Sequence, residues 1–332
     1  MNTRRNLERV NLLDSIPLSS PLFGYIEPTN YCNSRCLFCP TGTQVLPRQV
    51  GRKSGFMDYT FAMQVIDQFA EFPRKLKSFH FQHMGEPLLN KSLPYMIDYA
   101  VKKDVSEWYE LRTNGLLLEP KINQRLINSG LTRIGVSVNG LNAEMYKANC
   151  GIKVNFNQFV DNLSDLFMRR GECEIYIKII DTHLTDEDKV NFFKIFKPIS
   201  TDLQIEYLVD WGRSDGHDFK LGEPEGNTMK GYAPILKEVC PYPFFTLGVT
   251  WNGEAIFCCF DWSYATSCGN VKDTTLNEIW GGERLRQFRI QQLSLKREEN
   301  PACKGCMSFH MCVDNLDNDR EMLIERLEAD HE

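Results

Sequence analysis

Between residues 20 and 212, strand-like and helix-like segments alternate along the chain. Short runs rich in β-branched and aromatic residues take turns with amphipathic helical patterns. Parallel strands joined by crossover helices produce this order, so we expect an α/β fold with a parallel sheet. The six predicted strands are Leu22–Glu27, Ser78–Gln82, Glu107–Leu111, Arg133–Val138, Cys173–Ile180 and Leu203–Val209. The clearest predicted helices are Tyr59–Glu71, Leu93–Lys103, Lys121–Ser129 and Phe156–Arg170.

Composition narrows the class of protein. The 332 residues are 42% apolar and 25% charged, which is ordinary for a soluble globular protein, and the net charge is -6. No basic block favours a nucleic-acid partner, and no apolar run approaches the ~20 residues of a membrane span. The start of the chain lacks the apolar region of a signal peptide. The twelve cysteines fall in tight groups, so we expect metal binding in a reducing cytoplasm rather than disulfides.

The tightest group, Cys32, Cys36 and Cys39, directly follows the first predicted strand. Three thiolates can hold three irons of a four-iron cluster and leave the fourth iron open to a small molecule. A zinc site that lacks its fourth ligand, or ordinary buried thiols, would also fit three nearby cysteines. Parallel barrels place their chemistry at the carboxyl ends of their strands, and the position of this group therefore favours a catalytic cluster.

The C-x3-C-x2-C spacing, with Phe38 before the last cysteine, resembles the radical S-adenosylmethionine (SAM) superfamily. The resemblance implies a partial (β/α)6 TIM-like barrel whose 4Fe-4S cluster binds SAM at its open iron. Reductive cleavage of SAM then gives a 5′-deoxyadenosyl radical. The segment His83-Met-Gly-Glu-Pro87 resembles the "GGE" motif of that superfamily. The predicted cofactor-binding residues are Phe38, Gly85, Glu86, Asn114 and Ser137.

One expected residue is absent. Many relatives carry an arginine after the fourth strand, in a run like Tyr-x-x-Arg-Gly, where this chain has Tyr146-Lys-Ala-Asn-Cys-Gly151. Lys147 is the substitute we expect for the contact with the SAM carboxylate.

The cysteines near the C-terminus resemble a second pattern. Cys240 precedes a predicted hairpin around Asn252-Gly253, and the remaining members of the group follow it. Their arrangement is similar to the SPASM domain and its shorter "twitch" relative, which bind auxiliary clusters. The full SPASM pattern needs a later cysteine that this chain lacks, so the resemblance implies one auxiliary 4Fe-4S cluster. Its expected ligands are Cys240, Cys258, Cys303 and Cys306, with Cys312 as an alternative ligand. Four thiolates would also suit a structural zinc ion.

These patterns divide the chain. We expect an N-terminal extension at 1–20, a radical SAM core barrel at 21–212 and a linker at 213–239. A small SPASM/twitch domain, a hairpin plus a helix near 276–292, should occupy 240–315, followed by an acidic tail at 316–332. Cys150, Cys173, Cys259 and Cys268 remain outside both groups, and most should be buried packing residues.

The resemblance implies an oxidoreductase. The radical would remove a hydrogen atom from a substrate, and the auxiliary cluster would take the remaining electron. A sugar, aminocyclitol or related small polyol is the favoured substrate. The alternatives are crosslinking or epimerisation of a ribosomal peptide, or a non-catalytic iron–sulfur scaffold or redox sensor. A flavodoxin or ferredoxin would supply electrons. Candidates for the catalytic base are Asp181, His183, Glu206, Asp210 and Arg213.

Overall fold

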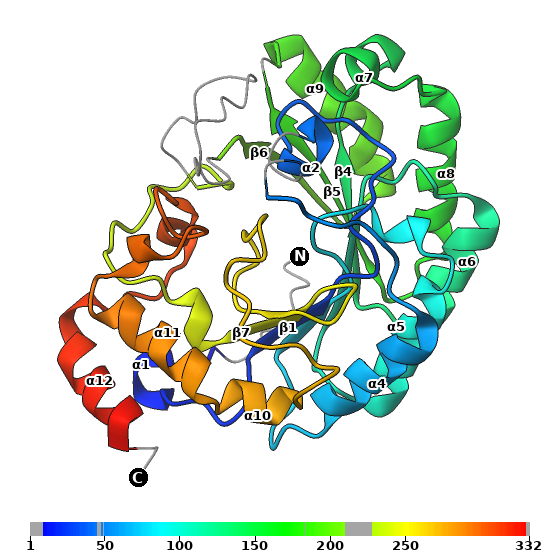
Figure 1. Cartoon of the computed structure of the whole chain (residues 1–332). Helices are drawn as coiled ribbons and strands as arrows, with labels where there is room; N and C mark the ends of the chain where they lie inside the picture. The colour runs from blue at the N-terminus through cyan, green and yellow to red at the C-terminus, as the bar shows by residue number, and fades with distance from the viewer. Residues whose placement is uncertain (1–8, 45–47, 49, 183, 210–227, 330–332) are drawn as a thin grey trace.

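The structure is a computed structural model that describes residues 9–44, 48, 50–182, 184–209 and 228–329. Its centre is a curved, open sheet with the strand order β6-β5-β4-β3-β2-β1-β7-β8. Helices cover the outer face of this arc (Figure 1). The predicted α/β class and open parallel barrel are therefore confirmed.

The six predicted strands form the parallel part of the sheet, and each pairs with the next one along the chain. Their alternation with helices gives this order directly. The strands are β1 (Phe23–Ile26), β2 (Ser78–His80), β3 (Tyr109–Thr113), β4 (Arg133–Val138), β5 (Glu174–Asp181) and β6 (Asp202–Tyr207).

Side-chain caps define the first turns of two of the outer helices. Asp58 caps α4 (Tyr59–Ala70) by accepting hydrogen bonds from two backbone amides of its first turn. The helix α9 (Asp186–Phe196) begins with a capping box formed by Thr185 and Asp188. The remaining outer helices are α5 (Leu93–Lys103), α6 (Pro120–Asn128), α7 (Ala143–Cys150) and α8 (Phe156–Arg169).

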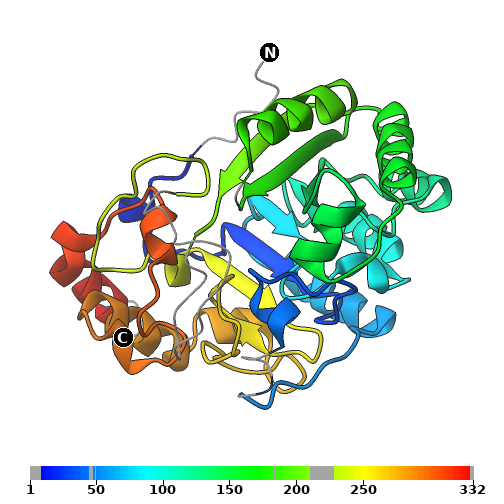
Figure 2. The same ribbon diagram turned by 90° about the horizontal axis from the view of Figure 1, so that it is seen from above.

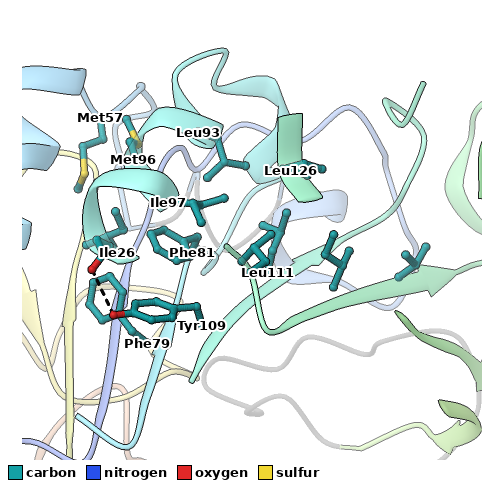
Figure 3. Packing of buried hydrophobic residues seen from close by; sticks show 14 of the residues in the cluster. Ile26, Met57, Phe79, Phe81, Leu93, Met96, Ile97, Tyr109, Leu111 and Leu126 are labelled. Carbon is teal, nitrogen blue, oxygen red and sulfur yellow. Dashed lines mark hydrogen bonds between the residues drawn. The ribbon is translucent and has the colours of Figure 1, made fainter. Parts of the chain in front are cut away.

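The main core lies between these helices and the sheet. Phe79 of β2 and Phe81, which directly follows that strand, are both fully buried, and their rings lie 5.3 Å apart in an edge-to-face contact. Figure 3 shows Phe81 close to Ile97 of α5, and the Tyr109 hydroxyl donating to the Ala100 carbonyl. Because apolar side chains fill the outer face, the polar residues of the strands face the inside of the arc.

The C-terminal hairpin extends the same sheet. Its strand β7 (Thr246–Val249) pairs in parallel with β1, and β8 (Ala255–Ile256) pairs antiparallel with β7. Figure 2 shows the blue β1 beside the yellow β7. The predicted turn at Asn252-Gly253 is confirmed, and Gly253 has the positive φ of 101° that the turn requires. The hairpin is thus attached to the barrel through backbone hydrogen bonds.

A second, smaller core joins both ends of the chain. The helix α1 (Leu12–Ser15) packs near α11 (Glu283–Leu293) and α12 (Arg320–Ala329), as Figure 1 shows. The helix α12 lies within the segment predicted as an acidic tail, and its Leu323 and Leu327 are buried. The predicted helical piece near 276–292 is two helices, α10 (Leu276–Trp280) and α11, separated by Gly281-Gly282. The core residues are Leu12, Ile16, Val239, Phe244, Leu293, Leu316, Leu323 and Leu327.

Short elements complete the described chain. The helix α2 (Pro40–Thr43) begins directly after Cys39, and the 3-10 turn η1 (Pro87–Leu89) directly follows Glu86. Other 3-10 turns are η2 (Lys197–Ile199), η3 (Tyr242–Phe244), η4 (Arg297–Glu299), η5 (Ser308–Met311) and η6 (Asp317–Asp319). No helix in the described ranges is both long and apolar enough to span a bilayer.

Candidate active site

The three cysteines of the first group line one cavity at the carboxyl ends of the strands. The cavity has a volume of about 240 Å³. All five predicted cofactor-binding residues line it as well: Phe38, Gly85, Glu86, Asn114 and Ser137. These residues come from four separate chain segments, which converge on the place where the sequence predicts a cluster and SAM. Their roles as ligands form part of the proposal below.

The three cysteines of this loop differ in exposure: Cys36 is buried, Cys39 is partly buried and Cys32 is exposed at the surface. Desolvation by the surrounding protein raises the pKa of Cys32 to about 12 and that of Cys39 to about 11. Such thiols lose their protons only when metal cations compensate the negative charge of the thiolates. The Ser34 hydroxyl also lines the cavity, is buried and lies beside Cys36. Three thiols that line one cavity, with a buried hydroxyl beside them, fit an iron–sulfur cluster.

The motif around Gly85 is held tightly against the cysteine loop. A Cβ atom at Gly85 would lie 2.4 Å from the Tyr31 carbonyl oxygen and 2.5 Å from that of Thr29, so only glycine fits. The Glu86 carboxylate accepts hydrogen bonds from the Thr113 hydroxyl at 2.6 Å and the Asn114 amide at 2.7 Å. These contacts join the second and third strand ends and fix the floor of the cavity. Burial raises the pKa of Glu86.

Glu27 connects this motif to the C-terminal hairpin. Its fully buried carboxylate lies 3.2 Å from His83 Nδ1 and accepts hydrogen bonds from the Met84 amide at 3.2 Å and the Trp251 amide at 3.4 Å. The Tyr264 hydroxyl donates to it at 2.7 Å. Although burial opposes ionisation, these contacts lower the pKa of Glu27. Glu27 ends the first predicted strand, but no sequence pattern identified it as a site residue.

The loop between Cys258 and Cys268 reaches the cavity. Its Trp262 lines the cavity beside the three cysteines of the first group. Arg52 holds this loop, because it donates to the Trp262 carbonyl at 3.1 Å and to the Thr41 hydroxyl at 3.2 Å. The segment that follows Cys258 therefore supplies part of the wall of this cavity, which the sequence did not predict.

Two cationic side chains line the cavity, Arg112 and Lys178. Lys178 forms a buried ion pair with Glu206, and the Tyr176 hydroxyl donates to the same carboxylate at 2.7 Å. Burial lowers the pKa of Lys178. Burial also disfavours the ionised form of Glu206, yet Lys178 and Arg112 leave its pKa lowered. Lys147, the substitute expected from the sequence, is exposed and does not line this cavity.

The predicted bases lie in different surroundings. Glu206 is buried in the ion pair with Lys178 and does not line the cavity. Asp181 pairs with Lys189 at 2.9 Å and accepts a hydrogen bond from the Leu184 amide. The other three candidates, His183, Asp210 and Arg213, lie outside the described residues.

The second group of cysteines comes from three chain segments, which carry Cys240, Cys258 and the pair Cys303 and Cys306. Cys303, Cys306 and Cys312 are close enough for their charges to act on Cys240. Burial is the main cause that raises the pKa of Cys240 and Cys258 well above the usual thiol value. Within the described residues, no three His, Cys, Asp or Glu side chains converge as the ligands of one metal ion do. A four-iron cluster spreads its thiolates over separate irons and needs a wider arrangement.

An unsatisfied amide marks this second site. Gln292 of α11 is fully buried, and within the described chain neither its nitrogen nor its oxygen has a hydrogen-bond partner by distance and angle. The side chain lies beside Cys303, where it favours the thiolate, although burial raises the pKa of Cys303 to about 12. Leaving such a group unpaired costs about 1–3 kcal/mol, so a polar occupant is expected next to it. An iron–sulfur cluster, whose sulfurs accept hydrogen bonds, fits this place.

Comparison with known families agrees with this geometry. The family model of the radical SAM superfamily matches residues 26–190, and that of the SPASM iron-sulfur cluster-binding domain matches residues 240–307. The chain belongs to the radical SAM superfamily. As a member with a SPASM domain, it binds a 4Fe-4S cluster and SAM in its barrel. Its C-terminal part binds auxiliary iron–sulfur clusters. The predicted family is therefore confirmed.

Two curated relatives show how far the similarity extends. An AdoMet-dependent heme synthase of Nitratidesulfovibrio vulgaris is 24% identical over 340 residues, which covers 87% of this chain and 89% of that protein. A GTP 3′,8-cyclase of Staphylococcus haemolyticus is 24% identical over 202 residues. That match covers 58% of this chain and only 56% of the cyclase, little more than half of its length.

Two solved structures share the fold. BtrN in complex with AdoMet and 2-DOIA superimposes with a TM-score of 0.55 at 19% identity, and covers 86% of this chain and 92% of BtrN. Streptococcus suis SuiB bound to S-adenosylmethionine gives a TM-score of 0.63 at 13% identity, and covers 89% of this chain and 72% of SuiB. At these identities the likeness establishes the architecture.

Proposed function

We propose that this radical SAM enzyme oxidises a small polyol, such as a sugar or aminocyclitol, at the cavity shared by Cys32, Cys36, Cys39 and Trp262. Bound SAM and its cluster would supply a radical that removes a hydrogen atom from a substrate carbon, and an auxiliary cluster would accept the electron left once the attached hydroxyl has lost its proton. The alcohol thereby loses two electrons and two protons and becomes a ketone.

The observation that carries this proposal is the shared wall of the cavity. Trp262 belongs to the loop that begins at the auxiliary ligand Cys258, so a substrate in the cavity would lie beside the auxiliary segment. Arg112 lines the same cavity, and its charge also reaches Cys259, whose pKa burial raises to about 12. Proximity of this kind suits transfer of an electron from substrate to the auxiliary centre. The ligands we propose for that centre are Cys240, Cys258, Cys303 and Cys306, with Cys312 as the alternative.

Solved structures of this architecture support each of the two substrate classes. The complex of BtrN with AdoMet and 2-DOIA is consistent with a small substrate in this architecture. A ribosomal peptide is the competing proposal, and its support is the fold shared with SuiB, which was also solved bound to the precursor peptide SuiA.

A substrate screen tests the proposal. Reconstituted protein, SAM and a one-electron reductant such as flavodoxin or ferredoxin would be incubated with sugars, aminocyclitols and peptides. We expect one polyol to yield a ketone together with one 5′-deoxyadenosine per product. A crosslinked or epimerised peptide would contradict the proposed substrate class. A complete lack of 5′-deoxyadenosine would instead favour a scaffold or sensor.

We further propose that Lys178 provides the positive charge for the SAM carboxylate in place of the missing arginine. The double variant Lys178→Met/Glu206→Gln removes this charge without leaving a buried carboxylate unpaired. We expect it to weaken SAM binding by roughly 10- to 100-fold, because a charged hydrogen bond contributes about 1.5–3 kcal/mol. Calorimetric titration of SAM into cluster-loaded protein measures the effect. Lys147→Met is the matched control and should bind SAM with the wild-type affinity. Equal losses of SAM affinity in both variants would contradict the role proposed for Lys178.

A further inference from the structure

Cys150 is a buried cysteine outside both predicted ligand sets. It is the last residue of α7 and is completely buried. Its sulfur lies 3.4 Å from the sulfur of Cys36, close enough for an S–H···S hydrogen bond. Cys36 lines the SAM cavity, whereas Cys150 does not. Cys150 therefore approaches Cys36 from within the protein rather than from the side open to SAM.

Backbone contacts fix this pair of thiols. The Arg35 amide donates to the Cys150 carbonyl at 3.0 Å, and the Leu37 amide donates to the Asn149 carbonyl at 3.0 Å. The two residues that flank Cys36 are thus both tied to the end of α7. The chain leaves this helix through Gly151, which has a φ of 64° and ends it in the left-handed conformation. The backbone contacts therefore hold Cys36 and Cys150 next to each other in the fold.

Other polar groups also lie near the Cys36 sulfur, among them the Ser34 hydroxyl and the Asn139 side chain. The Asn139 side-chain nitrogen lies 3.8 Å from the Cys36 sulfur, and the Asn149 side chain donates to the Asn139 carbonyl at 2.8 Å. A thiolate that ligates iron can only accept hydrogen bonds, so Cys150, as a thiol, must be the donor in its contact with Cys36. Hydrogen bonds to cluster sulfurs withdraw negative charge and favour the reduced cluster.

We propose that the Cys150 thiol donates a hydrogen bond to Cys36 and raises the reduction potential of the SAM-binding cluster. This inference rests on the proposed role of Cys36 as a cluster ligand. Cys150 is a positioning residue in this account, because it acts on the cluster through Cys36 and touches neither SAM nor substrate. It would make the cluster easier to reduce, and reduction must precede the cleavage of SAM.

A redox titration of the reconstituted protein, followed by electron paramagnetic resonance, tests this role. Cys150→Ala should shift the midpoint potential of the SAM-binding cluster to a more negative value. Cys150→Ser keeps a hydroxyl donor and should show a smaller shift. Cys173→Ala is the matched control, since Cys173 is also buried but bonds to the Glu174 carbonyl far from either cysteine group. Its potential should equal that of the wild type.

A second measurement covers the case in which Cys150→Ala does not fold. The infrared S–H stretch of cluster-loaded wild type should contain a band, lowered by hydrogen bonding, that Cys150→Ser lacks. Equal potentials in Cys150→Ala and Cys173→Ala, or no lowered band, would overturn the inference while leaving radical formation intact. If instead the cluster persists without Cys32, Cys36 and Cys39, the ligand assignment itself is wrong, and the two failures can be told apart.

Discussion

Replacing Cys32, Cys36 and Cys39 together with alanine should abolish cleavage of SAM and halve the iron content. The three thiols line the same cavity, and we expect them to hold one four-iron cluster. The auxiliary cysteines lie in other segments and should keep their own cluster. Iron should therefore fall from about eight to about four atoms per chain. Colorimetric iron analysis and chromatography of 5′-deoxyadenosine measure the two effects.

The control for this triple variant is the pair of single variants Cys173→Ala and Cys268→Ala. Neither residue belongs to the proposed ligand sets, so both variants should keep about eight irons and form 5′-deoxyadenosine. A triple variant that retains all of its iron would show that the cluster is bound elsewhere.

Replacing Glu27 with alanine should destabilise the protein by about 3–5 kcal/mol, because several buried donors would lose their acceptor at a cost of about 1–3 kcal/mol each. The carboxylate is completely buried and binds His83, the Met84 amide and the Tyr264 hydroxyl. Its loss would leave these donors without a partner in the interior. Because Met84 precedes Gly85, SAM binding should weaken as well. Urea unfolding of the metal-free protein measures the stability.

The matched control is Glu107→Ala. Glu107 forms an ion pair with Lys77 at 2.8 Å, but 38% of its side chain is exposed. Exposed pairs contribute about 0–1 kcal/mol, so this variant should unfold close to the wild-type urea concentration. If Glu27→Ala were as stable as Glu107→Ala, the contacts of Glu27 with Met84 and Tyr264 would contribute nothing measurable to the stability of the protein.

The sequence predicted the barrel well because its signals are local. Arg133–Val138 and Leu93–Lys103 have the predicted bounds, since apolar periodicity and flanking turn residues define them without reference to distant contacts. The helix α12 was missed because charged residues dominate its composition. Only Leu323 and Leu327, one turn apart, reveal the face that packs on the second core. The pairing of β7 with β1 joins residues more than 200 positions apart, which no local pattern encodes.

The site residues also divide into those that a local sequence pattern marks and those whose place depends on the fold. Cysteine spacing and the Gly85-Glu86 motif are short patterns, so the sequence could identify both. Lys178 escaped notice because it sits within the apolar strand β5, where the two-residue alternation of the strand places it on the same cavity-facing side as Ile180. Trp262 was likewise hidden, since its place depends on how the loop after Cys258 folds back over the barrel. A buried charged residue in a predicted strand, such as Lys178 or Glu206, is the signal that could have suggested a polar barrel interior.

The most direct test of the central claim is anaerobic reconstitution of the wild-type protein, followed by iron analysis and incubation with SAM and reductant. The account predicts about eight irons per chain and formation of 5′-deoxyadenosine. About four irons without 5′-deoxyadenosine would contradict it, because the cavity lined by Cys32, Cys36 and Cys39 would then hold no catalytic cluster.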